Sequence, residues 1–208
     1  MKLKSLKGFA LSAATVALGI AGAISAPDAS AQAAEQFFPL LSYRTGPYAP
    51  NGTPWANGKQ DYIKLVNARG GINGVKITFE ECETGYATDK GVECYERLKS
   101  KNGGATLIDP QSTGITFALT DKAPHDKIPL ITLGYGLSAS QDGMAFPWNF
   151  PYMGSYWTGA DIIIQAIAKR EGGFDKLKGK KVALVYHDSP CGKEPIPLLQ
   201  ERAKQLGY

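Results

Sequence analysis

The stretch NARGGINGVKI, Asn67 to Ile77, joins two kinds of structure and decides the fold class. Upstream of it, residues 53–71 have the apolar spacing of a helix, and two consecutive glycines form a typical helix stop. Downstream, residues 75–81 alternate apolar and polar side chains, which is the pattern of a strand. The stretch therefore predicts a helix followed directly by a strand, the repeating step of an α/β protein.

The same alternation of strand and helix extends in both directions and predicts βαβ units with a parallel sheet. Thr53 is the expected N-cap of the first helix with Pro54 at its first position, and Thr88 is the expected cap of the second. Residues 46–52 are expected to form a turn. The expected strands are 37–43, 75–81, 105–109, 128–132 and 180–188, and the expected helices are 53–71, 88–101, 114–126, 156–170 and 193–207.

The alternation breaks at residues 133–155, which are rich in glycine, proline and aromatic residues. Such a stretch between two α/β runs is typical of a crossing between domains. We therefore expect one α/β lobe at 34–150 and the start of a second at 151–208. Gly207 has the position of a helix C′ residue. A sheet rarely ends on such a stop, so we expect a longer protein, the alternative being a natural product of this length.

The first 33 residues have the composition of an export signal. Residues 1–8 are basic, residues 9–26 are apolar but interrupted by small side chains, and residues 28–33 suit cleavage after Ala31 or Ala33. We therefore expect a signal peptide at 1–33 and export to the periplasm. The alternative is an uncleaved anchor, but no stop-transfer flank follows the apolar run.

This segment also supplies most of the positive charge of the chain. The formal net charge is +4; without Lys2, Lys4, Lys7 and Asp28, 20 basic and 18 acidic side chains remain, a net +2. So small an excess does not indicate binding to nucleic acid or to an anionic membrane. The 43% of hydrophobic residues is typical of a globular protein and excludes a disordered one.

Three cysteines in an oxidising compartment favour one disulfide and one free thiol. Cys82 follows the expected strand at 75–81 and Cys94 lies in the next expected helix, so a bridge would join strand end to helix. Closing a loop of about a dozen residues contributes about 3 kcal/mol in the chain-entropy model. We expect this bridge, with Cys191 free. The alternative is two free thiols, and no CxxC metal spacing occurs.

Five segments share their order and spacing with one protein family. They are SYRTGPYAPNG, NARGGINGVKI, LIDPQSTGITFAL, KIPLITLG and VALVYHDSPCG. In these segments the chain resembles the periplasmic solute-binding proteins of ABC transporters, of the branched-chain amino acid-binding (type I) class. The resemblance implies two doubly wound α/β lobes, a small solute bound between them, lobe closure recognised by a membrane permease, no cofactor, and a monomer.

The turn PQSTG, residues 110–114, follows an expected strand and opens an expected helix. Solutes of open parallel sheets lie beyond the carboxyl ends of strands, where helix N-termini bind anions. We therefore expect Gln111, Ser112 and Thr113 to hold a carboxylate or carbonyl group, and the resemblance implies the same role. The alternative is a turn whose hydroxyls only cap the helix.

Other walls of the cleft are expected after two further strands. The turn after the first strand contributes Tyr48 and Asn51. Where the family resemblance implies small residues and a threonine that helps to hold an ammonium group, this chain has Gly134, Tyr135 and Gly136. The solute is therefore expected to be amino acid-like, or an aromatic or carboxylate compound that packs on tyrosine.

The second lobe is expected to contribute Tyr156 and Cys191 to ligand binding. At Cys191 the family often has a tyrosine, so one ring is lost there. Tyr86 and Trp148 are candidates for additional rings, the alternative being that they pack the lobe.

His187, Asp188 and Cys191 lie close in the sequence and raise the alternative of a cysteine hydrolase or a metal-assisted enzyme. Adjacent residues of a strand point to opposite faces, so His187 and Asp188 could not both serve. The motifs HExxH, GxSxG and CxxC do not occur. We therefore expect binding without catalytic residues or a metal. A sensor or receptor domain of the same fold is the other alternative.

Overall fold

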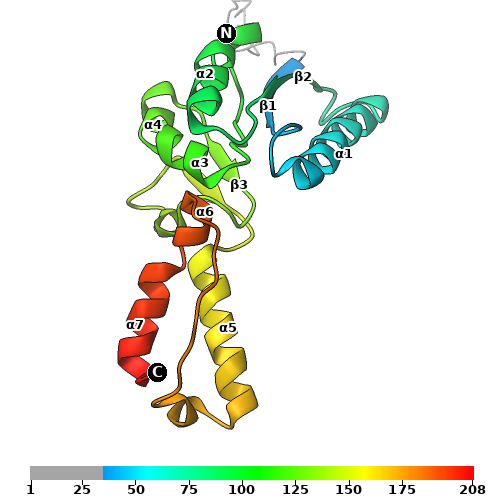
Figure 1. Ribbon diagram of the computed structural model, residues 1–208. Coiled ribbons are helices and arrows are strands. Elements are labelled where there is room, and N and C mark those ends of the chain that lie inside the picture. Colours follow the sequence, from blue (N-terminus) through cyan, green and yellow to red (C-terminus); the bar gives the residue numbers. More distant parts are fainter. Residues whose placement is uncertain (1–34) are drawn as a thin grey trace, which may run out of the picture. The chain divides into compact units, whose positions relative to one another are not determined.

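The computed structural model describes residues 35–208, so the signal peptide predicted at 1–33 lies outside the described residues. Helices and short parallel strands alternate along the chain, as the sequence predicts (Figure 1). The strands are β1 (Glu35–Ser42), β2 (Lys76–Glu83), β3 (Leu130–Thr132) and β4 (Asn149–Pro151). The helices are α1 (Ala49–Ala68), α2 (Thr88–Leu98), α3 (Thr113–Thr120), α4 (Lys122–Asp126), α5 (Tyr156–Glu171), α6 (Pro190–Lys193) and α7 (Ile196–Leu206).

All strand pairings among the described residues that join these elements are parallel. β1 pairs with β2, and β3 pairs with β4. Residues 105–109, expected as a strand, make isolated parallel bridges to β1 on one side and to β3 on the other. The resulting order is β2, β1, 105–109, β3, β4, which is the order of a doubly wound α/β sheet.

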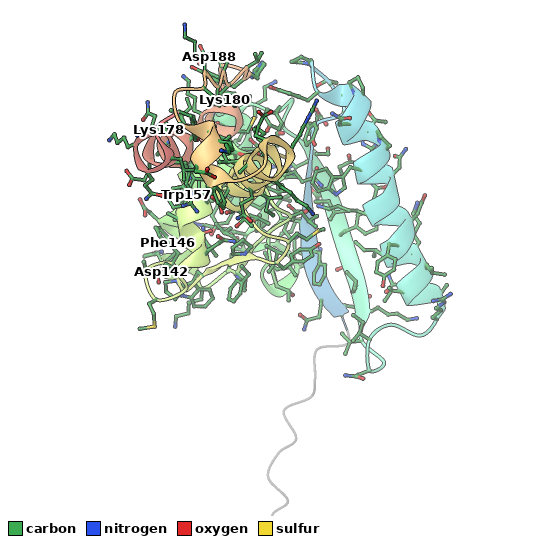
Figure 2. All side chains as sticks on the ribbon, turned by 90° about the horizontal axis from the view of Figure 1, so that it is seen from below. Asp142, Phe146, Trp157, Lys178, Lys180 and Asp188 are labelled. Atoms are coloured by element: carbon green, nitrogen blue, oxygen red, sulfur yellow. A yellow bond between two sulfur atoms is a disulfide. The ribbon has the colours of Figure 1, made fainter. Side chains whose placement is uncertain are left out.

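Alternate side chains of β1 pack into two different clusters. Leu40 packs with Ile63 of α1 and Ile77 of β2. Phe37 and Leu41 belong to the larger cluster, which also contains buried residues of α2 and α3. Because successive strand residues point to opposite faces, α1 covers one face of the β1–β2 pair, and Figure 2 shows it there, with the other helices on the far side.

Helix α1 begins four residues earlier than the sequence predicts. Its N-cap is Tyr48, so part of the expected turn at 46–52 is helical and Thr53 is not the cap. Pro50 lies in the first turn, where a missing N–H costs nothing, and Pro54 is accommodated inside the helix. The early start places Gly52 directly against Tyr43, since an added Cβ would meet the Tyr43 carbonyl oxygen at 2.1 Å.

Two other helix predictions need correction. Thr88 is the first residue of α2 rather than its cap; the cap is Ala87, which makes no side-chain hydrogen bond. The helix predicted at 114–126 is divided into α3 and α4 at Asp121. Pro124 explains the break, because it lacks the N–H that would bond to the carbonyl of Thr120.

The connection at 133–155 contains an unexpected strand, β4, which extends the sheet beyond β3. By contrast, the strand predicted at 180–188 is not formed among the described residues. Residues 180–188 pair with no other strand in the described part of the chain, and Val185 is 95% exposed. The helix predicted at 193–207 corresponds to α7, which begins only at Ile196, after Pro195, while Lys193 ends the short helix α6. Gly207 ends α7 in the left-handed conformation, as expected.

The predicted disulfide is present. Cys82 and Cys94 are bridged, with Cα atoms 5.9 Å apart, and Cys191 is free. The bridge joins the end of β2 to α2 and therefore fixes the loop at 84–87 between them. Within residues 35–208, no helix is long and apolar enough to cross a membrane.

Candidate functional site

The strand order places a reversal of connection between β1 and residues 105–109. From β1 the chain crosses to β2 on one side, and from β2 it returns to residues 105–109 on the other side of β1. The loops that leave the carboxyl ends of β1 and of 105–109 therefore diverge at a topological switch point, which is where the ligand crevice of such sheets is expected. These loops are residues 43–48 and 110–112.

The turn that opens α3 lies at this crevice. Ser112 is the N-cap, and its hydroxyl accepts a long hydrogen bond of 3.4 Å from the N–H of Ile115. Ser112 therefore caps α3, as the alternative prediction for this turn states. The N–H groups of Thr113 and Gly114 open the helix and have no acceptor within it. Their place at a helix N-terminus suits an anionic or carbonyl group.

Gly114 has no room for a side chain. An added Cβ would lie 2.6 Å from the Thr88 hydroxyl, at the start of α2, and 3.5 Å from Pro190, at the start of α6. The first turns of α2, α3 and α6 thus meet at one point.

Gln111 and Tyr135, both expected to bind the solute, form hydrogen bonds with the protein itself. The Gln111 N–H donates to the Tyr135 hydroxyl at 2.8 Å and to a carboxylate oxygen of Asp109 at 3.2 Å. The Tyr135 hydroxyl in turn donates to Asp109, and its ring packs edge to face on Trp55. The roles of Gln111 and Tyr135 as direct ligands therefore stay predictions.

Tyr135 lies between Gly134 and Gly136, which both have a positive φ, of 69° and 104° respectively. The Gly136 N–H donates to the Thr113 hydroxyl at 3.4 Å. An added Cβ on Gly136 would meet Thr116 at 3.1 Å, so the loop after β3 lies close against α3. The structure thus brings Thr113, Tyr135 and Gly136 together.

Tyrosine rings from two loops meet on the other side of the crevice. Tyr86, in the loop after β2, lies 4.4 Å from the Tyr48 ring and 5.1 Å from the Tyr43 ring, between centroids. Tyr86 has a φ of 67°, which a bulky side chain rarely adopts. Burial, reinforced by the nearby Cys191 thiol, raises the pKa of Tyr86 well above its ordinary value. These rings offer a desolvated aromatic wall.

Glu83, the last residue of β2, holds the two tyrosine-bearing loops together. One carboxylate oxygen accepts from the Ser42 hydroxyl at 3.0 Å and the Arg44 N–H at 2.8 Å. The other accepts from the N–H and hydroxyl of Thr45 and from the N–H of Gly85, at 2.9 to 3.2 Å. Burial pushes the pKa of Glu83 up, but these hydrogen bonds outweigh it and leave the pKa lowered. The carboxylate is therefore fully occupied.

Residues of the later segment reach the same crevice. The Tyr156 hydroxyl lies 3.1 Å from the Thr113 hydroxyl, and the Tyr48 hydroxyl lies 2.8 Å from Nδ1 of His187. The Cys191 thiol lies 3.0 Å from the Ser189 hydroxyl. His187 is thus engaged with Tyr48 rather than with the thiol, which gives the hydrolase alternative no support. Within residues 35–208, no group of three potential ligands could hold a metal ion.

The other candidates lie elsewhere. Asn51 is exposed on the first turn of α1, and Trp148 packs against the core cluster of α2 and α3. Sequence reasoning missed Asp109, Lys59 and Tyr43. Asp109 could have been found, because an acidic residue at the end of an apolar strand is placed at the ligand edge of a sheet.

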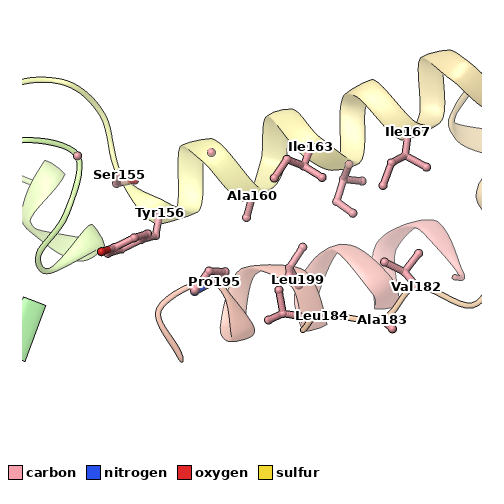
Figure 3. Close-up of a pocket in the computed structure, with 13 residues that line it drawn as sticks. Ser155, Tyr156, Ala160, Ile163, Ile167, Val182, Ala183, Leu184, Pro195 and Leu199 are labelled. Carbon is pink, nitrogen blue, oxygen red and sulfur yellow. The ribbon is translucent and has the colours of Figure 1, made fainter. Parts of the chain in front are cut away.

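An apolar cavity lies apart from the turn at 110–114. It has a volume of about 450 Å³ and lies between α5, α7 and residues 182–184 (Figure 3). Ile163, Ile167, Val182 and Leu199 face it, and Tyr156 lies at its end toward Thr113. Its lining is that of a hydrophobic core rather than of a site for a polar solute.

Comparison with known proteins identifies the class of molecule. The family model of the periplasmic binding proteins matches residues 35–208. A crystal structure of an ABC transporter permease from the Pseudomonas fluorescens group is 46% identical, with a TM-score of 0.72 over 84% of this chain and 43% of that chain. A branched chain amino acid ABC transporter from Thermus thermophilus, solved with valine, is 24% identical, with a TM-score of 0.70 over 83% of this chain and 43% of that one.

Among curated proteins, the Leu/Ile/Val-binding protein BraC3 of Rhizobium johnstonii is 25% identical over 93 residues, which are 45% of this chain and 25% of that protein. The chain spans less than half the length of these relatives. The expected type I fold is confirmed by the parallel α/β order and by the 46% identical structure. Because the family model covers residues 35–208, the chain belongs to the periplasmic binding protein family, a family of solute-binding proteins.

Proposed function

We propose that the protein binds a small organic solute outside the cytoplasm and delivers it to the permease of an ABC transporter. Export, delivery and closure of a second lobe over the solute are parts of this proposal, with a boundary between the lobes near residue 150. The observation that carries it is the turn 110–114, which presents the N-terminus of α3 at the point where the sheet connections reverse.

The solute's polar head is assigned to this turn. The N–H groups of Thr113 and Gly114 and the hydroxyls of Ser112 and Thr113 favour a carboxylate. The body of the solute packs on Tyr48 and Tyr86, whose burial within a ring cluster supports an apolar or planar group.

The charges favour an aromatic carboxylate over an α-amino acid. An ammonium group is held best by a free carboxylate, and the two carboxylates at the ends of β2 and of residues 105–109 are engaged with the protein itself. Glu83 accepts five hydrogen bonds from its own loops. Asp109 pairs with Lys59 and Tyr135.

A thermal-shift series on the full-length mature protein tests this proposal. Benzoate is compared with benzamide, which lacks the carboxylate, with cyclohexanecarboxylate, which lacks the aromatic ring, and with L-leucine and L-valine. A ligand at about a hundred times its Kd stabilises by about 2.7 kcal/mol. We expect benzoate to give the largest shift. A larger shift with leucine would overturn the aromatic class, and no shift with any of the five at millimolar concentration would overturn the proposed solute class altogether.

A further inference from the structure

A buried carboxylate lies directly behind the turn. Asp109 is 9% exposed, and its two oxygens have different partners. One forms an ion pair with the ammonium of Lys59 from α1. The other accepts hydrogen bonds from the Tyr135 hydroxyl and the Gln111 N–H. Burial raises the pKa of Asp109 while the Lys59 charge opposes that rise, so the charged carboxylate depends on these partners.

The same groups hold Gln111 in an unfavourable conformation. Gln111 has a φ of 55°, in the left-handed region that only glycine adopts without cost. In the amide orientation that satisfies both ends, its side chain donates to the Leu41 carbonyl at 3.2 Å and accepts from the Lys59 ammonium at 2.5 Å. The Leu41 carbonyl lies in β1 and the Lys59 ammonium in α1. The two acceptors of the backbone N–H, Tyr135 and Asp109, come from the loop after β3 and from the end of residues 105–109.

The direction of the chain at Gln111 determines where the next N–H groups point. We propose that Asp109, Lys59 and Tyr135 form a clamp of positioning residues that fixes the Ser112–Gly114 turn for the solute. This inference rests on the proposed function, because it assigns the turn to binding. It gives Tyr135 a different role from direct ligand contact, since its hydroxyl is committed to Asp109 and Gln111.

The substitution Tyr135→Phe removes only the hydroxyl and retains the ring that packs on Trp55. Tyr95→Phe is a matched control. Tyr95 also donates its hydroxyl to a carboxylate, that of Asp126 at 2.8 Å, and this carboxylate is also paired with a lysine, Lys99 at 3.0 Å. A purely structural role predicts that the two variants behave alike.

The full-length protein and both variants are compared by benzoate titration calorimetry, denaturant melts and amide hydrogen exchange of residues 110–115. We expect Tyr135→Phe to weaken benzoate binding about tenfold, equivalent to about 1.4 kcal/mol, and to speed exchange in this segment. We expect Tyr95→Phe to do neither, even where it lowers stability equally. If benzoate does not bind the wild type, the proposed solute class fails, and exchange alone decides the clamp. Unchanged exchange at 110–115 in Tyr135→Phe overturns the clamp.

Discussion

Two segments with strand-like sequences adopt different structures in this molecule. β1 is paired with β2, and its Leu41 is 1% exposed. Residues 180–188 have a comparable apolar content, but they are not a strand, and Val185 is 95% exposed. A strand-like sequence only favours a strand, because the backbone N–H and C=O groups also need a neighbouring strand with which to form hydrogen bonds. The environment of each segment, more than its composition, decides its structure.

The largest expected effect tests this contrast directly. Leu41→Ala removes a buried side chain from the main cluster and should lower the free energy of unfolding by about 3 to 4 kcal/mol. Val185→Ala, at an exposed position, should change it by less than about 0.5 kcal/mol. Denaturant melts of the 208-residue chain measure both values. Equal losses would mean that residues 180–188 are as well packed as β1.

The next effect concerns the disulfide, which joins β2, the strand paired with β1, to α2. Replacing Cys82 and Cys94 together by serine should lower stability by about 3 kcal/mol, whereas Cys191→Ser should be nearly neutral. Thiol counting should find one reactive thiol in untreated, denatured protein and three after reduction. Three thiols before reduction would contradict the bridge.

A smaller effect distinguishes a shielded carboxylate, that of Asp126, from an exposed one, that of Asp188, although both pair with a lysine. The Tyr95 hydroxyl, with His125 and Lys99, lowers the pKa of Asp126 to about 2 despite an opposing effect of burial. Because the folded-state pKa is below the ordinary value of 3.8, the stabilisation is present above that value and is lost as the pH falls toward 2.

Asp126→Asn should therefore reduce the loss of stability between pH 4 and pH 2, measured by melts at each pH. The matched change is Asp188→Asn, whose partner is Lys193 at 2.5 Å; the Asp188 side chain is 84% exposed. Screening by solvent makes such a pair contribute little, so this variant should follow the wild type. If stability fell more steeply between pH 4 and pH 2 in Asp126→Asn than in the wild type, this account would be contradicted.

The sequence predicted the alternation of elements and the disulfide, because both depend on local patterns. It misplaced the start of α1, since Pro50 and Pro54 are equally acceptable near a helix N-terminus, and the contact of Gly52 with Tyr43 that accompanies the earlier start is not visible in a local pattern. It also missed β4, a three-residue strand with no periodicity to detect.

The candidate site was predictable in part. The turn at 110–114 was visible because polar residues follow a strand and open a helix. The ion pair of Asp109 with Lys59 joins residues 50 positions apart in the chain, and no local pattern carries such a contact. The hydrogen bond from the Tyr135 hydroxyl to Asp109 could not be predicted for the same reason.

The central claim is that the turn at Ser112 holds the solute rather than only capping a helix. Calorimetric titration of Ser112→Ala with the tightest-binding compound of the thermal-shift series tests it most directly. Ser155→Ala is the control, because Ser155 caps α5 by accepting from the Thr158 N–H at 3.2 Å. Both variants should lose about 1 kcal/mol of stability. We predict that only Ser112→Ala loses affinity, by about 1.5 to 3 kcal/mol or ten- to a hundredfold; unchanged affinity in Ser112→Ala would contradict the account.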